Sequence, residues 1–213
     1  MGAVKDGPLR LATASIINCA GRGLHSGVAL RALKIGLEMV DVGPSPRYAS
    51  SCSGVDFFAV AIEQLFDQGW TYTQAAEWRP SVASALTQVY GHRGLKRKMV
   101  FKDARVSEIT AGPSEIWSFS PPCEPFSKRN HNRSEDELVL AGQQVAEMLW
   151  YPRLWRPKLI FVENVDEVEA VAIITAALKS LKGYIWKMIV TEARDYTGMC
   201  RARRLWIGAF KGV

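Results

Sequence analysis

Short apolar runs alternate with amphipathic stretches along most of this chain, and the alternation restricts the possible folds more than any other feature. Short apolar runs bounded by breakers are typical of buried strands, whereas apolar residues spaced three and four apart are typical of helices. Strands that alternate with helices build a mostly parallel sheet with helices on both faces. We therefore expect an α/β fold with one domain over residues 1–213.

The same patterns place the individual elements. The predicted strands are 48–52, 71–76, 99–101, 116–119, 159–163, 184–191 and 204–210. The predicted helices are 28–40, 57–67, 81–90, 136–149 and 165–181. Two segments read as loops, 91–98, which is rich in Arg and Lys, and 127–137, which is polar.

Composition excludes several classes of protein. Hydrophobic residues make up 48% of the chain, enough for a sizeable core. The 27 Lys and Arg residues against 21 Asp and Glu give a net charge of +6, a mild bias toward a polyanionic partner. The four cysteines are far apart and there are three histidines, so we expect no metal site and no disulfide framework.

The beginning of the chain carries no targeting signal that we can identify. It has no apolar signal core, and Asp6 breaks the myristoylation pattern. No stretch approaches the length of a membrane span. We expect a cytoplasmic protein with no membrane partner.

A cysteine between prolines follows the predicted strand 116–119. Residues 120–127 read Ser-Pro-Pro-Cys-Glu-Pro-Phe-Ser. Because proline fixes φ, this segment predicts a rigid turn that presents the thiol of Cys123 as a nucleophile. The alternative is a buried structural cysteine, the commoner role of an isolated cysteine.

A second segment, Glu163-Asn164-Val165, comes at the end of the predicted strand 159–163. In open α/β sheets, ligands bind at the carboxyl ends of the strands, where Glu163 would lie beside the strand that leads to Cys123. Taken alone, Glu163 is better explained as an ordinary glutamate at a strand end or a helix N-terminus.

Together the two segments resemble the DNA cytosine-5 methyltransferases, in which a Pro-Cys motif supplies the attacking thiolate and the Glu of Glu-Asn-Val grips the target base. The resemblance implies a Rossmann-type methyltransferase with a seven-stranded, mostly parallel sheet, S-adenosylmethionine as cofactor and a flipped cytosine of double-stranded DNA as substrate. It also implies a bacterial or phage origin. Cys123 would attack C6 of cytosine, Glu163 would engage N3, and Asn164 would brace the Pro-Cys loop.

The resemblance extends to a cofactor site. The family's Phe-x-Gly-x-Gly turn corresponds to residues 52–56, where Gly54 is kept, Cys52 replaces the aromatic residue and Asp56 replaces the second glycine. Glu77 would accept hydrogen bonds from the ribose hydroxyls and Asp103 from the adenine amine, although each acid alone reads as a solvated loop residue. The implied cofactor-binding residues are Cys52, Ser53, Gly54, Val55, Asp56, Phe57, Glu77, Trp78, Asp103, Ala104 and Pro121.

Residues 195–208 resemble the family's Gln-x-Arg-x-Arg segment, whose arginines hold the flipped base and nearby phosphates. The Arg-x-Arg spacing favours Arg201 and Arg203, which we assign to the catalytic set. A competing alignment matches Cys200 to the Gln and Arg204 to the last Arg, and neither alignment keeps the Gln. A solvated basic turn remains an alternative.

The rest of the resemblance concerns domain organisation. Residues 21–40 loosely resemble the helix that closes the cofactor pocket at the family's other end, which would make this chain a circular permutation. No segment corresponds to a target-recognition domain, so either a second polypeptide would supply recognition or the chain would be a minimal enzyme with loose specificity. Two other functions stay open, a non-catalytic methyltransferase-like module that binds DNA or protein, and an RNA cytosine-5 methyltransferase.

Overall fold

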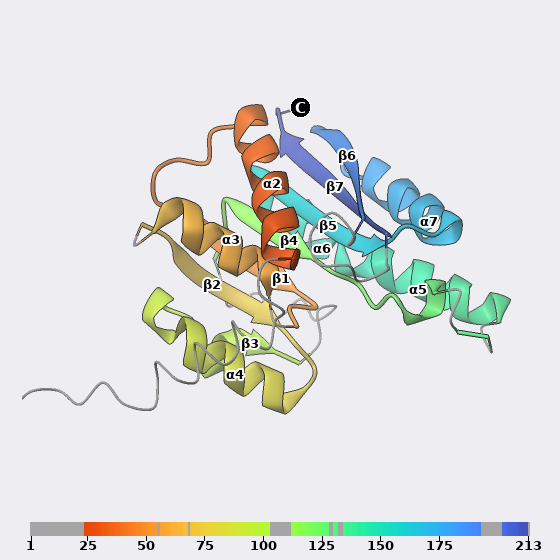
Figure 1. The fold of residues 1–213 in the computed structure, drawn as a ribbon, viewed down its shortest axis with the longest axis horizontal. Helices are drawn as coiled ribbons and strands as arrows, with labels where there is room; N and C mark the ends of the chain where they lie inside the picture. The colour runs from red at the N-terminus through yellow and green to blue at the C-terminus, as the bar shows by residue number, and fades with distance from the viewer. Residues whose placement is uncertain are drawn as a thin grey trace, which may run out of the picture.

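The computed structural model describes residues 24–54, 56–67, 69–102, 112–127, 130–131, 134–192 and 202–212, with the backbone alone at 24–26, 192 and 202–203. Helices cover both faces of one central sheet (Figure 1).

The sheet has seven strands in the order β3-β2-β1-β4-β5-β7-β6. Neighbouring strands from β3 to β5 run parallel, whereas β7 is antiparallel to both β5 and β6. The predicted seven-stranded, mostly parallel sheet is therefore confirmed. The strands are β1 Arg47–Ser51, β2 Thr71–Ala76, β3 Val100–Phe101, β4 Ile116–Phe119, β5 Leu159–Val165, β6 Tyr184–Glu192 and β7 Ala202–Phe210.

The strand β5 is apolar on both faces over most of its length because helices bury both faces of the sheet. In β5, Leu159 and Phe161 pack in one core, and Ile160 and Val162 pack in the other. The first core is covered by α2 Leu24–Met39, α3 Phe57–Phe66 and α4 Pro80–Tyr90, and the second by α5 Glu135–Met148, α6 Trp150–Trp155 and α7 Val168–Lys179.

The structure differs from the sequence-based prediction at several places. The expected helix 165–181 begins only at Val168, because β5 continues to Val165, which pairs with Arg203 of β7. The short helix α6 was not predicted, since Pro152 interrupts its apolar pattern. The segment 91–98, expected to be a loop, contains two 3₁₀ turns, Gly91–Arg93 and Arg97–Met99.

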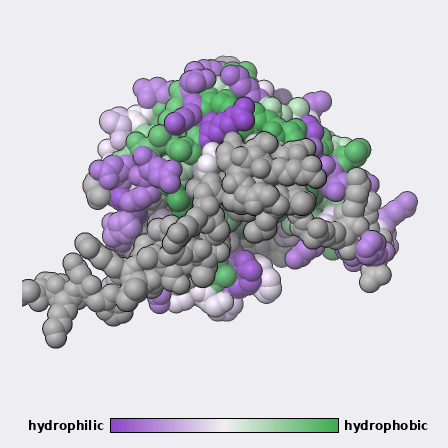
Figure 2. All heavy atoms as spheres, viewed as in Figure 1, coloured by the Kyte–Doolittle hydropathy of each residue, from purple (hydrophilic) through white to green (hydrophobic). Residues whose placement is uncertain are grey.

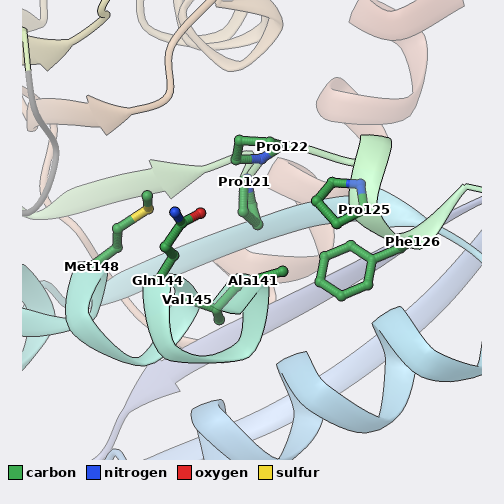
Figure 3. Close-up of a pocket in the computed structure, with 8 residues that line it drawn as sticks. All are labelled: Pro121, Pro122, Pro125, Phe126, Ala141, Gln144, Val145 and Met148. Carbon is green, nitrogen blue, oxygen red and sulfur yellow. The ribbon is translucent and has the colours of Figure 1, made fainter. Parts of the chain in front are cut away.

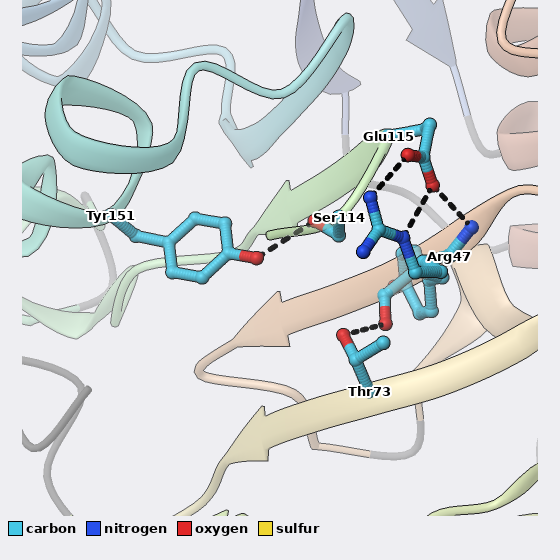
Figure 4. Close-up of polar contacts among 6 residues, drawn as sticks. Arg47, Thr73, Ser114, Glu115 and Tyr151 are labelled. Carbon is cyan, nitrogen blue, oxygen red and sulfur yellow. Dashed lines mark hydrogen bonds and ion pairs between the residues drawn. The ribbon is translucent and has the colours of Figure 1, made fainter. Parts of the chain in front are cut away.

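Polar contacts fasten β1 and β4 at the amino-terminal edge of the sheet (Figure 4). Glu115 accepts hydrogen bonds from the backbone nitrogen and guanidinium of Arg47, at 2.6–3.1 Å. The hydroxyl of Tyr151 on α6 donates to Ser114 Oγ at 2.8 Å. These contacts lie at the edge opposite the carboxyl ends of β1 and β4, so they are candidates for stability rather than chemistry.

Several apolar residues reach the surface at the edge strand β6. Ile185, Met188 and Val190 of the edge strand β6 are each about half exposed. In Figure 2, viewed as in Figure 1, apolar residues show mostly in the upper part of the face. None of the helices in the described segments combines the length and hydrophobicity needed to cross a bilayer.

Candidate active site

Cys123 lies in the turn that follows β4. It precedes the 3₁₀ turn Glu124–Phe126, and its carbonyl oxygen accepts a hydrogen bond from Phe126 N at 3.1 Å. The side chain is half-buried and packs against a small apolar cluster of Phe126, Ala141, Val165 and Ala170. The turn therefore presents the thiol partly exposed at the carboxyl edge of the sheet.

A small pocket separates this turn from α5 (Figure 3). Gln144 is the polar side chain among residues that are otherwise apolar, and Cys123 is not part of the lining. The pocket thus adjoins the Pro-Cys turn without including Cys123 in its lining. It is lined by Pro121, Pro122, Pro125, Phe126, Ala141, Gln144, Val145 and Met148.

Asn164 joins the end of β5 to the Pro-Cys loop. Its side chain is fully buried, and its Nδ2 donates a hydrogen bond to the carbonyl oxygen of Pro121 at 3.0 Å. Its Oδ1 accepts from Val165 N at 2.8 Å. The expected contact between Asn164 and the Pro-Cys loop is present.

Glu163 lies at the same edge of the sheet. β4 and β5 pair in parallel, with Phe119 opposite Val162, so Glu163 and the loop of Cys123 follow neighbouring strand positions. Successive side chains of a strand point to opposite faces, so Glu163 and Asn164 diverge. Glu163 is partly exposed and pairs with Leu205 of β7.

The structure describes only part of the predicted arginine site. Arg201 lies outside the described residues, and only the backbone of Arg203 is described, opposite Val165 and two rungs past Glu163. Arg204, the last arginine of the competing alignment, is engaged elsewhere, because its Nε donates to Asp166 Oδ1 at 2.7 Å.

The turn after β1 has left-handed backbone at alternate positions. The φ angles are 54° at Cys52, 50° at Gly54 and 55° at Asp56. Such angles favour glycine, and a cost on the order of 1–2 kcal/mol applies to most other residues. The turn thus keeps glycine-like geometry at position 56, where the sequence has aspartate.

Glu77 connects this turn to the end of β2. Its Oε2 accepts from Gly54 N at 2.9 Å, and its Oε1 accepts from Arg79 N and Nε at 2.9 and 3.1 Å. Next to it, Trp78 is 73% exposed, unusually open for an indole. An open aromatic face and a carboxylate therefore adjoin the glycine turn.

The other expected cofactor residues are distributed as follows. Ser53 lies in the turn and donates from its backbone nitrogen to Ala76 O at 3.0 Å. Phe57 packs partly buried against the first core, and Cys52 contacts Met148 of α5 at 3.9 Å. Pro121 is buried. The assignments of Val55, Asp103 and Ala104 lie outside the described residues.

Asp56 turns its carboxylate into the core. Oδ1 accepts from Ala59 N at 3.0 Å, which caps α3, and from the Tyr48 hydroxyl at 2.6 Å, while Oδ2 accepts from the Tyr72 hydroxyl. Burial raises the pKa of Asp56, and these donors oppose the rise. Burial, reinforced by the Asp56 charge, raises the pKa values of Tyr48 and Tyr72 well above the ordinary value. Any contact between Asp56 and a cofactor would therefore involve the backbone of Asp56.

Sequence reasoning missed Tyr48, Tyr72 and Arg79. The two tyrosines are partners in the β1–β2 register, with ring centroids 4.9 Å apart. Each tyrosine is one of the first two residues of a predicted strand. Pairing of β1 with β2 would have placed the two tyrosines side by side, so this signal was present in the sequence. Arg79 carried no comparable signal.

Sequence comparison decides the family. A model of the C-5 cytosine-specific DNA methylase family matches residues 47–212. The chain belongs to this family. The resemblance is thereby confirmed, and so is S-adenosylmethionine as the family's cofactor. α2 lies outside the matched residues. No curated protein matches the chain.

Solved structures share the fold at low identity. TrmN from Thermus thermophilus has a TM-score of 0.55 at 14% identity over 83% of this chain and 47% of its own. The S. pombe Dnmt2 methyltransferase has a TM-score of 0.53 at 15% identity over 79% of this chain and 51% of its own. NSun6 from Pyrococcus horikoshii has a TM-score of 0.62 at 11% identity over 90% of this chain and 53% of its own. The chain thus spans about half the length of these proteins.

Metal ligands are not gathered in this site. Among the residues that the structure describes, no three His, Cys, Asp or Glu side chains come together as they would around an ion.

Proposed function

We propose that this chain transfers a methyl group from S-adenosylmethionine to C5 of cytosine in DNA. The observation that carries the proposal is the hydrogen bond from Asn164 to the carbonyl oxygen of Pro121, which ties the Glu-Asn-Val and Pro-Cys segments together at one edge of the sheet. Ligands of open α/β folds bind at this edge. The net charge of +6 favours a nucleic acid over a small neutral substrate.

The proposed chemistry begins with Cys123. C5 of cytosine is a poor nucleophile until a thiolate adds to C6, and a hydrogen bond from protonated Glu163 to N3 helps that addition. The new Sγ–C6 bond makes C5 electron-rich, so C5 would take the methyl group as its bond to the sulfonium sulfur breaks and a neutral thioether is left. A base such as water would then remove the C5 proton, and the electrons of the C5–H bond would re-form the C5–C6 double bond and expel the Cys123 thiolate. Because C5 and C6 are stacked inside duplex DNA, the base must first be flipped out.

Residues of the turn after β1 would hold the cofactor, which supplies an electrophilic methyl group. The chemistry of the donors fits a nucleoside. Trp78 offers an open indole face for adenine. Glu77 already accepts three hydrogen bonds, and a carboxylate has about four acceptor positions, which leaves room for a ribose hydroxyl. Gly54 keeps the backbone accessible at the centre of the turn.

Covalent trapping tests the proposal. Duplex DNA and RNA that contain 5-fluorocytosine are incubated with labelled S-adenosylmethionine and the chain, alone and with any protein encoded beside it. We expect a covalent adduct with DNA that disappears in Cys123→Ser and falls sharply in Glu163→Gln. An adduct with RNA alone would replace the DNA assignment. Methyl transfer that persists in both variants would end the proposal.

The second candidate is a methyltransferase-like module without catalysis, favoured by the replaced residues at positions 52 and 56. Calorimetry with S-adenosylmethionine separates the two functions, because the module predicts no binding with or without DNA. Target recognition by a second polypeptide and the role of α2 as a permuted closing helix stay predictions.

A further inference from the structure

A buried hydrogen-bond network lies beneath the turn after β1. From Ser53 Oγ it passes to Ser50 Oγ at 2.5 Å and from there to the Tyr72 hydroxyl at 2.5 Å. Tyr72 and Tyr48 both donate to Asp56, and the Tyr48 hydroxyl also lies 2.5 Å from Ser118 Oγ on β4. The network therefore joins the turn to β1, β2 and β4, and β4 leads directly into the loop of Cys123.

Asp56 is the residue in this network that most needs support. Its backbone is left-handed, with φ 55° and ψ 71°, and aspartate adopts this conformation less readily than glycine. Both carboxylate oxygens are hydrogen-bonded, and the residue is 3% exposed. A buried carboxylate held at both oxygens cannot rotate without losing these bonds, so the side chain fixes the backbone.

We propose that Tyr48 and Tyr72 are positioning residues of the cofactor turn, because they hold Asp56 in the conformation that a glycine would otherwise supply. The inference rests on the proposed function, which places S-adenosylmethionine on this turn. The aspartate at position 56 would then be compatible with cofactor binding, because two tyrosines do what glycine does by its lack of a side chain. Burial raises the pKa values of both tyrosines, which keeps their hydroxyls protonated as donors.

Cofactor affinity of matched tyrosine variants tests this role. Calorimetry measures S-adenosylmethionine binding to the full chain and to Tyr72→Phe and Tyr48→Phe, well below their unfolding temperatures. We expect each to bind about fivefold to tenfold more weakly, as loss of one hydrogen bond at the turn implies. Tyr151→Phe is the control, because it removes a buried hydroxyl that bonds Ser114 at the opposite edge of the sheet (Figure 4). Equal weakening in all three variants would overturn the inference.

A double-mutant cycle separates positioning from general destabilisation. Glycine adopts the left-handed conformation unaided, so Asp56→Gly should bind the cofactor within about threefold of the native chain. In that background Tyr72→Phe should have no further effect on affinity, because there is no longer a carboxylate to hold. The tyrosine hydroxyls keep partners in Ser50 and Ser118, which favours folding of Asp56→Gly. The same loss in both backgrounds would contradict the proposal.

If the native chain binds no cofactor, the proposed function is wrong. Hydrogen exchange then still tests whether the tyrosines hold Asp56. Tyr72→Phe should still speed exchange of the Ala59 amide, which Asp56 caps, while Tyr151→Phe should leave it unchanged. Faster exchange in Tyr72→Phe alone supports the hold on Asp56. Unchanged exchange in Tyr72→Phe overturns it, whatever the cofactor result.

Discussion

Asn164 and Pro121, 43 residues apart in the chain, are joined by a 3.0 Å hydrogen bond between the amide of one and the carbonyl oxygen of the other. The bond is fully buried, so bulk water does not compete with Asn164 as the donor. Because Pro121 stands two residues before Cys123, the bond sets the position of the loop that carries the thiol.

Asn164→Ala should therefore lower the turnover of methyl transfer by about tenfold or more, since a displaced nucleophile loses alignment. It should also lower the free energy of unfolding by about 1–3 kcal/mol, the range for a buried polar group left unpaired. Thr175→Val is the control, because it removes the acceptor of the Trp206 indole on the same side of the sheet, away from the loop. Turnover that falls equally in both variants would show a purely structural role.

Gly54→Ala should weaken cofactor binding. The φ angle of 50° is strained for alanine, although the nearest atom to an added Cβ is Arg79 Nη2 at 4.0 Å. The backbone conformation, and not the space for a Cβ, therefore disfavours alanine at position 54, at a cost of about 1 kcal/mol or more in the free energy of the turn. Gly91→Ala is the matched control, since Gly91 has φ −57° and open space around it. Calorimetry with S-adenosylmethionine and thermal unfolding of both variants check the contrast.

Trp78→Ala should reduce cofactor affinity with little change in stability. The indole is 73% exposed, so its removal costs the fold little buried area. Base–aromatic stacking is worth about 1–3 kcal/mol, which corresponds to roughly fivefold to a hundredfold in affinity. Trp78→Phe should recover part of the loss. Leu154→Ala, at a half-exposed apolar residue on α6, should change neither quantity. Unaltered binding in Trp78→Ala would remove the indole from the cofactor site.

Stability should fall at acidic pH partly through Glu115. Burial alone would raise the pKa of Glu115, but the hydrogen bonds from Arg47 outweigh it and lower that pKa below the ordinary value of 4.5. The unfolded chain therefore binds more protons as the pH drops, so this stabilisation is present above pH 4.5 and is lost below it. The effect should be modest, because Arg47 is 45% exposed.

Denaturant unfolding of Glu115→Gln across this pH range measures the contribution. Its stability should decline less steeply on acidification than that of the native chain. Glu147→Gln, at an exposed position of α5, is the control and should follow the native curve. Parallel curves for Glu115→Gln and the native chain would exclude the Arg47 pair as a source of the acid sensitivity.

The centre of the sheet could be predicted because β4 and β5 are buried on both faces and read as largely apolar runs. β2 and β4 have the predicted bounds, Thr71–Ala76 and Ile116–Phe119. The start of α7 could not be read from the chain, because the extension of β5 to Val165 depends on pairing with β7, nearly forty residues later. Local periodicity carries no information on such a partner.

The site was predicted unevenly for a similar reason. The Pro-Cys motif and the Glu-Asn-Val motif are each formed by consecutive residues. Their residue types and the strands before them were therefore sufficient to place Cys123 and Glu163 at one edge of the sheet. The role of Asp56 depends on Tyr48 and Tyr72, which come from two different strands. In sequence Asp56 looks like the loss of a glycine, and only its buried partners reveal how the backbone conformation is kept.

The antiparallel strand β7 has a consequence for engineering this fold. Because β7 lies between β5 and β6 and pairs with both, Glu192 at the end of β6 faces Ala202 at the start of β7. These two anchors are paired to each other at the edge that carries Glu163. A foreign sequence spliced between them would enter and leave at this edge without changing the path of any strand. The β6–β7 hairpin is therefore a natural graft point for an added recognition module.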